Sequence, residues 1–293
     1  MTKKILYSAT GSPKDPGFDG IEIDGVPYKE HFNNKGIIAL ERVIASCHGC
    51  FDKMTTYSGQ LQILADRGDR VVGCLNGGLL FGLASIQATQ VSVPIFFNPT
   101  DYTAYQGFVV PSGRAVVAGV GVEQMSEHIN SGAFQRIKML RLAERVLNLE
   151  SDRVNVLCDY AKEGDKLKAQ LADFGIEVNN AFDSRSLSLV YARNEYNHLL
   201  NVKGHTFIWA EPNFNPKNWK TMISSEARHH TLLYNSAPNA QVYGVDGLAM
   251  MAAKIISLQR PDVRDKILKT TRSYPDQRDL VAEVDNEAVR MGL

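Results

Sequence analysis

The stretch that best predicts the fold runs from Asp69 to Gly121 and reads DRVVGCLNGGLLFGLASIQATQVSVPIFFNPTDYTAYQGFVVPSGRAVVAGVG. This stretch contains three short apolar runs, Val71–Leu75, Val93–Phe97 and Ala115–Gly119. A continuous apolar run of this length predicts a strand that is buried on both faces. Such strands are typical of a parallel sheet that is covered by helices.

Glycines follow two of these predicted strands. The first run ends in Asn76-Gly77-Gly78, and the third ends in Gly119-Val120-Gly121. Glycine lets the backbone turn sharply and brings its N–H groups close to a ligand. Ligands of open parallel sheets bind beyond the carboxyl ends of the strands. The stretch therefore predicts one rim of a small-molecule site.

The composition narrows the class of protein. At 293 residues, with 44% hydrophobic and 22% charged residues, the chain is typical of a globular protein and too apolar for long disorder. The length suits one large α/β domain or two of about 150 residues. Lysine plus arginine equals aspartate plus glutamate, at 32 each. Because no net positive charge is available for phosphates, we expect no nucleic-acid partner.

The chain shows no sign of membrane insertion or secretion. No apolar run is long enough to span a bilayer, and the apolar part of the N-terminal MTKKILYSATGS is too short for a signal peptide. We therefore expect a cytoplasmic protein with no membrane partner. Its four cysteines are too few and too scattered for a disulfide framework: Cys47, Cys50, Cys74 and Cys158.

Strands and helices are expected to alternate along the whole chain. The first half is expected to contain a strand at Lys4–Ala9 and helices at Gly36–Ser46, Phe51–Arg67 and Glu123–Leu149. The second half is expected to contain strands at Val154–Cys158, Ile176–Val178 and Thr206–Ala210, and helices at Gly164–Phe174, Leu187–Leu200, Gly247–Leu258 and Pro261–Arg272. The turn-rich residues 16–34 predict a hairpin or an irregular segment rather than a helix. This alternation predicts an α/β fold with parallel sheets.

The chain divides into two similar halves. Glu150-Ser151-Asp152 is polar and predicts a boundary between a domain at 1–150 and a second at 151–293. Helical stretches at 137–149 and 248–260 occupy comparable places near the ends of the two halves. The shared pattern suggests an old internal duplication.

The order of short motifs resembles a known family. Gly11-Ser12-Pro13-Lys14-Asp15 follows the first strand, and Ser46-Cys47-His48-Gly49 comes later in the same half. Asn76-Gly77-Gly78, Val93-Pro94-Ile95 and Val110-Pro111-Ser112-Gly113-Arg114-Ala115-Val116-Val117-Ala118 follow in turn. This order is similar to that of the aminoimidazole ribonucleotide carboxylases, a family that includes the carboxyaminoimidazole ribonucleotide mutases of purine synthesis. Its members carry Gly-Ser-x-Ser-Asp, Ser-Ala-His-Arg, a Gly-Gly-Ala-Ala-His loop, a Pro-Val strand and Met-Pro-x-Gly-x-Pro-Val-Ala.

The resemblance implies a fold and an activity. The fold would be three-layered, with two tandem flavodoxin-like halves of which the second is degenerate. The activity would be a carboxylase or mutase reaction on a phosphorylated ribonucleotide, without a cofactor, in a homo-oligomer. His48 would be the acid/base that moves a proton on and off the imidazole carbon. The residues that would hold the substrate are Gly11, Ser12, Asp15, Ser46, Asn76, Gly77, Gly78 and Arg185.

The chain also departs from the family pattern. The arginine that follows the family's histidine is Gly49 here, and the family's second histidine falls at Leu80 or Phe81. The segment most like Ser-Ala-His-Arg in the second half, Phe182–Arg185, keeps an arginine and lacks the histidine. These losses support a second hypothesis, a nucleotide-binding or nucleotide-sequestering protein that has lost the chemistry.

Two further features have alternative interpretations. Cys47-His48-Gly49-Cys50 could be a redox pair, half of a zinc site, or two small buried cysteines around a histidine. No second pair of ligands completes a zinc motif, so no metal is expected. Trp209 and Trp219 could stack on a heterocyclic base, although aromatic residues more commonly pack in a core.

Overall fold

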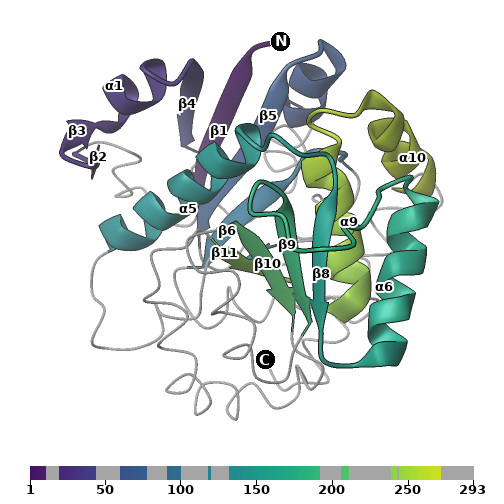
Figure 1. The fold of residues 1–293 in the computed structure, drawn as a ribbon. Coiled ribbons are helices and arrows are strands. Elements are labelled where there is room, and N and C mark those ends of the chain that lie inside the picture. The colour runs from purple at the N-terminus through teal and green to yellow at the C-terminus, as the bar shows by residue number, and fades with distance from the viewer. Residues whose placement is uncertain are drawn as a thin grey trace, which may run out of the picture.

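A computed structural model describes residues 1–10, 20–43, 60–77, 91–99, 118–119, 132–191, 206–210, 239–242 and 244–271. Figure 1 shows strands that form a central sheet with helices around it. The strands of the sheet are β1 (Lys3–Thr10), β4 (Ile37–Val43), β5 (Arg70–Gly77), β6 (Ile95–Pro99), β7 (Ala118–Gly119), β8 (Val154–Cys158), β9 (Leu187–Tyr191), β10 (Phe207–Ala210) and β11 (Asn239–Gln241). The helices are α1 (Tyr28–Asn33), one over residues 60–66, α5 (Gly132–Leu147), α6 (Ala161–Asp173), α9 (Gly244–Ile256) and α10 (Pro261–Thr271).

The main sheet has nine strands in the order β4-β1-β5-β6-β7-β11-β10-β9-β8. Neighbouring strands are parallel except β7 and β11, which are antiparallel and share the single pair Gly119 and Gln241. A small hairpin, β2 (Glu22–Ile23) and β3 (Val26–Pro27), lies outside this sheet. The predicted α/β fold, with parallel strands flanked by helices, is confirmed.

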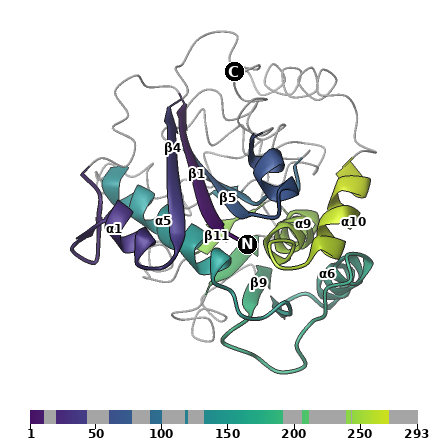
Figure 2. The same cartoon turned by 90° about the horizontal axis from the view of Figure 1, so that it is seen from above.

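The central strands are buried on both faces. Ile5, Val72 and Phe96 are buried in one core cluster with the apolar side chains of α5. Leu6 and Val71, which alternate with them, are buried as well. Since successive residues of a strand face opposite sides of the sheet, helices are needed on both sides. Figure 2 shows α1 and α5 on one side of the sheet, and α9, α10 and α6 on the other.

The two halves of the sheet have the same strand order. In the first half, β4 lies outside β1, and β5, β6 and β7 follow on the other side. In the second half, an isolated parallel bridge joins Val178 to Val154 of β8, and β9, β10 and β11 follow on the other side. The helix after the last strand also packs alike, because α5 contacts β5 and β6 while α9 contacts β9 and β10. The predicted boundary at Glu150–Asp152 lies between α5 and β8, within one continuous sheet.

Most predicted elements that fall on the described residues are confirmed, but four predictions are wrong. The expected strand at Ile176–Val178 is only an isolated bridge between Val178 and Val154. The expected helix at Gly36–Ser46 is the strand β4 over Ile37–Val43, which pairs with β1 over seven residues. The expected helix at Leu187–Leu200 begins instead with β9, whose five residues are all buried between β8 and β10. Residues 28–33, expected to be irregular or part of a hairpin, form α1. Each segment has apolar residues that fit either period, and pairing with neighbouring strands or helices decided between them.

No helix within the described ranges is both long and apolar enough to cross a membrane.

Candidate functional site

The first-half strands end together at one edge of the sheet. Ala9 of β1 pairs with Val43 of β4 on one side and with Asn76 of β5 on the other. Asn76 in turn pairs with Asn98 of β6. Because these strands are parallel, their carboxyl ends form a common edge, which is where ligands of open α/β sheets bind.

The chain leaves this edge into the segments that contain most of the predicted site residues. Gly11, Ser12 and Asp15 follow β1, Ser46 and His48 follow β4, and Gly78 follows β5. These six residues lie outside the described residues. Because residues 37–43 form a strand, the Ser46–Gly49 motif follows a strand, as its counterpart does in the family that the motif order resembles.

Asn76 and Gly77 are the last two residues of β5 and lie at this carboxyl edge. One level deeper in the sheet, the paired residues Tyr7, Cys74 and Phe96 are fully buried. Burial raises the pKa of the Cys74 thiol, so Cys74 is a core residue rather than a nucleophile. In the backbone pairing, Asn76 and Asn98 come two residues after this buried row.

Helix α5 runs back from this edge across the sheet. Asn148, just after its last turn, accepts a hydrogen bond from Lys3 at the start of β1. The 16 residues of α5 span about 24 Å, close to the ~26 Å of an eight-residue strand. The amino end of α5 therefore returns to the level of the carboxyl edge, where a helix start favours negative charge.

Arg185 precedes β9 by two residues, so it is near the amino end of that strand. Its neighbour Ser186 hydrogen-bonds to Ser151, and Asn148, three residues before Ser151, bonds to Lys3 at the start of β1, so Arg185 lies toward the amino ends of the first-half strands. Its guanidinium binds the carboxylate of Asp183, at 3.2 and 3.3 Å, and both side chains are at least partly exposed. Hydrogen bonds from Arg185 lower the pKa of the Asp183 carboxyl. Among the described residues, Arg185 thus binds Asp183 of the same turn. The structure does not bring Arg185 beside Asn76 and Gly77.

A polar cluster holds that turn in place. Asn155, which is 3% exposed, donates to the carbonyl oxygen of Asp183 at 2.8 Å and to the Ser188 hydroxyl at 3.1 Å. Its side-chain oxygen accepts from the Asn179 amide and from the Asp183 N–H, both at 3.0 Å. Every hydrogen-bonding position of Asn155 is therefore used within the protein, which indicates a structural role.

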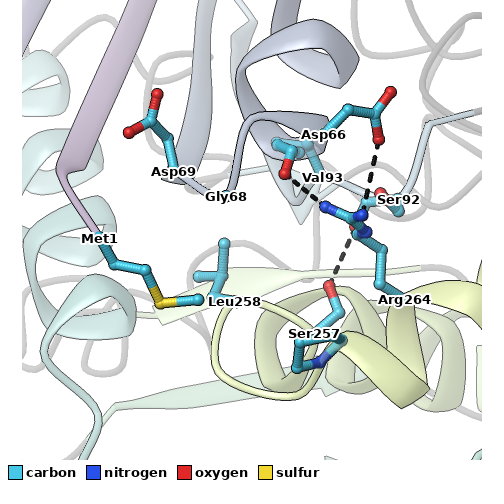
Figure 3. A pocket seen from close by; sticks show the side chains of 11 residues that line it. Met1, Asp66, Gly68, Asp69, Ser92, Val93, Ser257, Leu258 and Arg264 are labelled. Carbon is cyan, nitrogen blue, oxygen red and sulfur yellow. Dashed lines mark hydrogen bonds and ion pairs between the residues drawn. The ribbon is translucent and has the colours of Figure 1, made fainter.

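A cavity of about 130 Å³ lies at the amino edge, between the helix over residues 60–66 and the α9–α10 turn. Figure 3 shows Arg264 on one wall and Met1 and Leu258 on another. Arg264 donates to the Ala65 carbonyl oxygen and lies 3.7 Å from the Asp66 carboxylate. The Ser257 hydroxyl donates to the Ser92 carbonyl oxygen at 3.2 Å. These contacts bind α9 and α10 of the second half to the amino edge of the first.

Two buried side chains of the second half lie outside the candidate site. Trp209 is 2% exposed in β10, so this tryptophan packs in the core rather than standing open to stack on a base. Lys254 on α9 is fully buried, and this burial lowers its pKa to about 7. It lies in the last turn of α9, toward the amino edge, away from the candidate site.

Asn98 of β6, the backbone neighbour of Asn76 at this edge, is not among the residues predicted from the sequence. It ends the apolar run IFF within β6, and an amide at the end of a buried strand is a signal that could have singled it out. The described parts of the chain contain no group of three or more histidine, cysteine, aspartate or glutamate residues that could hold a metal ion. In comparisons with known proteins, no protein-family model matches the chain and no curated protein matches it.

Proposed function

We propose that the protein binds a phosphorylated aminoimidazole ribonucleotide, or a close analogue, at the carboxyl edge of β1, β4 and β5 and transfers carbon dioxide to or from it. The observation that carries this proposal is the register of these strands, in which Val43, Ala9 and Asn76 are neighbours. The motifs follow these strands in the sequence in the order that the resemblance requires, which supports the proposal.

The proposed chemistry needs a base, a phosphate site and a close backbone. In the carboxylation direction, the imidazole carbon forms a bond to carbon dioxide, and the proton that it loses passes to His48. A histidine suits this step because its ordinary pKa lies near neutrality. Ser12, Asp15 and Ser46 would bind the ribose and phosphate, and Gly77 and Gly78 would offer backbone N–H groups without a side chain in the way. The start of α5 adds a favourable field for the phosphate.

The tandem organisation is proposed on the same basis. The equal strand order of the two halves, and the like packing of α5 and α9, support two flavodoxin-like units that arose by duplication. Only the first half would hold the site. A homo-oligomer in the cytoplasm remains the expectation from the resemblance and the composition.

A second candidate is a nucleotide-binding protein without catalysis. The observation that favours it is Gly49 at the position of the family's arginine, because glycine cannot supply the two-pronged hydrogen bonding that arginine gives to a phosphate. The family's second histidine corresponds to Leu80 or Phe81 here, and its loss also favours binding without catalysis.

Calorimetry and an exchange assay separate the candidates. We expect the wild-type protein to bind aminoimidazole ribonucleotide and to exchange labelled carbon dioxide into carboxyaminoimidazole ribonucleotide. The His48→Ala variant should retain binding and lose exchange by about 100-fold or more, the usual contribution of a general acid/base. If the wild type binds the nucleotide but does not exchange carbon dioxide, the enzyme hypothesis is excluded and the non-catalytic binding protein is supported. Absence of binding to any phosphorylated ribonucleotide would exclude both.

A further inference from the structure

The cavity at the amino edge is lined partly by apolar and partly by polar side chains (Figure 3). The apolar lining includes three buried side chains: Ala65, Val93 and Leu258. The polar lining includes Arg264, Ser92 and Ser257. Because an engineered cavity of about 150 Å³ holds benzene, a volume of about 130 Å³ suits an organic molecule of about five or six non-hydrogen atoms.

The guanidinium of Arg264 leaves one buried donor unused. It donates to the Ala65 carbonyl oxygen and lies 3.7 Å from the Asp66 carboxylate. Its Nε is buried and has no hydrogen-bond partner among the described residues. Since a buried N–H group without a partner costs free energy, a molecule that brings an acceptor to this nitrogen gains affinity.

The two serine hydroxyls at the cavity already use their protons within the protein. The Ser92 hydroxyl donates to the side-chain oxygen of Gln62 at 3.2 Å. The Ser257 hydroxyl donates to the carbonyl oxygens of Ser92 and Lys254, at 3.2 and 2.7 Å. Because a hydroxyl has one proton and two lone pairs, each serine oxygen is available to a ligand only as an acceptor. The cavity therefore offers a ligand one donor and two acceptors.

The charges around the cavity are balanced, which favours a neutral ligand. The Asp69 carboxylate accepts a hydrogen bond from Lys4 at 2.7 Å. The Asp66 carboxylate faces Arg264 and accepts a hydrogen bond from Gln62 at 2.9 Å. Two carboxylates thus stand against two cations. A ligand carboxylate would meet both the charge of Asp66 and the lone pairs of the serine oxygens, so an anion is disfavoured.

We propose that this cavity binds a small neutral molecule that carries a primary amide on a short aliphatic body. The amide oxygen accepts from Arg264 Nε, and the amide NH₂ group donates to the hydroxyl oxygen of Ser92 or Ser257. The aliphatic part packs on Leu258. Because the cavity lies between the helix over residues 60–66 and the α9–α10 turn, the bound molecule contacts both halves and stabilises their packing. This site lies at the amino edge and is independent of the ribonucleotide site proposed at the carboxyl edge.

Three molecules of nearly the same shape test the class of ligand. Propionamide carries the acceptor and the donors, butanone carries the acceptor alone, and propionate carries acceptors with a negative charge. Ligand-observed NMR titration of the full chain measures the three affinities. We expect propionamide to bind at about millimolar concentration, as suits so small a ligand. Butanone should bind about threefold to tenfold more weakly because it lacks the donors, and propionate about tenfold or more weakly because of its charge.

Two variants test whether the amide binds in this cavity. Arg264→Gln removes the open donor and should weaken propionamide binding by about tenfold or more, as for a hydrogen bond from a charged group. Leu258→Phe fills the cavity without changing a polar group and should abolish binding. Lys269→Gln removes an exposed cation of the same helix, α10, and should leave the affinity within about twofold. Thermal unfolding reports whether each variant is folded.

Each outcome decides a part of the proposal. If the wild type does not bind propionamide, the cavity holds water alone and the proposal fails. If propionate binds as tightly as propionamide, the ligand class is wrong. If propionamide affinity is unchanged in both cavity variants, the molecule binds elsewhere. If a variant does not fold, the order of the three affinities in the wild type still decides the class of ligand.

Discussion

The two halves of the sheet share a strand order but differ in the length of one strand. In the first half, β4 pairs with β1 over seven residues, a length of about 23 Å that reaches the carboxyl edge. In the second half, the equivalent segment forms only the bridge between Val178 and Val154, the first residue of β8. The segment that follows it therefore stays at the amino edge and builds the Asn155 cluster. The length of the strand, rather than its place in the strand order, therefore decides at which edge of the sheet the following connection begins.

The same comparison explains why two similar motifs continue from different edges of the sheet. Ser46–Gly49 follows β4, and Phe182–Arg185 follows the segment with the Val178 bridge, which has the equivalent place in the second half. The first motif continues from a strand that ends at the carboxyl edge, where ligands bind. The second is confined near the start of β9, where Arg185 binds Asp183. A sequence match that keeps the order of elements need not keep the position in space.

The largest effect on stability is expected for the polar cluster around Asn155 in the second half. Asn155→Ala removes a buried amide that makes four hydrogen bonds, and leaves the Asp183 N–H and the Asn179 amide each short of a partner. We expect the free energy of unfolding to fall by about 2–4 kcal/mol. Chemical denaturation measures this, with the exposed Asn180→Ala as the matched control. A loss no larger than that of the control would mean that the cluster does not hold the turn.

The next test uses the buried lysine of α9. Because the pKa of Lys254 is about 7 in the folded protein and 10.5 ordinarily, the unfolded state binds more protons between these values. Stability should therefore rise with pH between about 7 and 10.5, with a contribution of up to about 1.4 kcal/mol per pH unit. Urea denaturation across this range should show a shallower slope for Lys254→Met than for the wild type. Equal slopes would show that Lys254 is protonated in the fold.

A smaller difference is expected between the helix pairs of the two halves. In the first half, Glu144 of α5 accepts hydrogen bonds from Lys35 and His31, and its side chain is 12% exposed. In the second, Asp246 of α9 binds Lys166 with a side chain that is 52% exposed. We expect Glu144→Gln to cost about 1 kcal/mol and Asp246→Asn less than ~0.5 kcal/mol, because solvent screens the exposed pair. Denaturation at pH 7 measures both, and equal costs would contradict the contrast.

The pH dependence of the first-half pair has a definite sign. Burial raises the pKa of the Glu144 carboxyl, but the hydrogen bonds from Lys35 and His31 outweigh it, so the pKa lies below its ordinary value of 4.5. The ionised form is therefore favoured by folding, and its contribution is present above pH 4.5 and lost as the pH falls through the lower, folded-state pKa. Glu144→Gln should flatten the acid limb of the stability profile. An unchanged acid limb would count against this coupling.

The smallest effect is expected at Arg185. Its side chain is mostly exposed and its ion pair with Asp183 is screened by solvent, so Arg185→Ala should leave the thermal midpoint nearly unchanged. Since it lies at the amino end of β9, we also expect it to leave nucleotide affinity nearly unchanged. Calorimetry on Arg185→Ala and on the wild type decides this, and a clear loss in the variant would restore Arg185 to the ligand site.

Sequence reasoning found the elements whose signal is local. The apolar runs of β1, β5, β6 and β8 predicted buried strands, and the amphipathic patterns of α6 and α10 predicted helices. It failed at β4 and β9, where short apolar segments fit either period. It singled out Asn76 and Gly77 through the glycine turn, but not the pairing of Asn76 with Asn98, because the two residues are 22 positions apart in the sequence.

The amino-acid sequence by itself determined that this is an α/β protein with buried parallel strands, because burial and periodicity are properties of each segment. Only the tertiary structure decided that residues 37–43 are a strand, that Asn76 and Asn98 are neighbours, and that Arg185 stays at the amino edge. These features depend on hydrogen bonds between strands that are distant in the chain, and the pattern of a single segment does not encode the register of its partner.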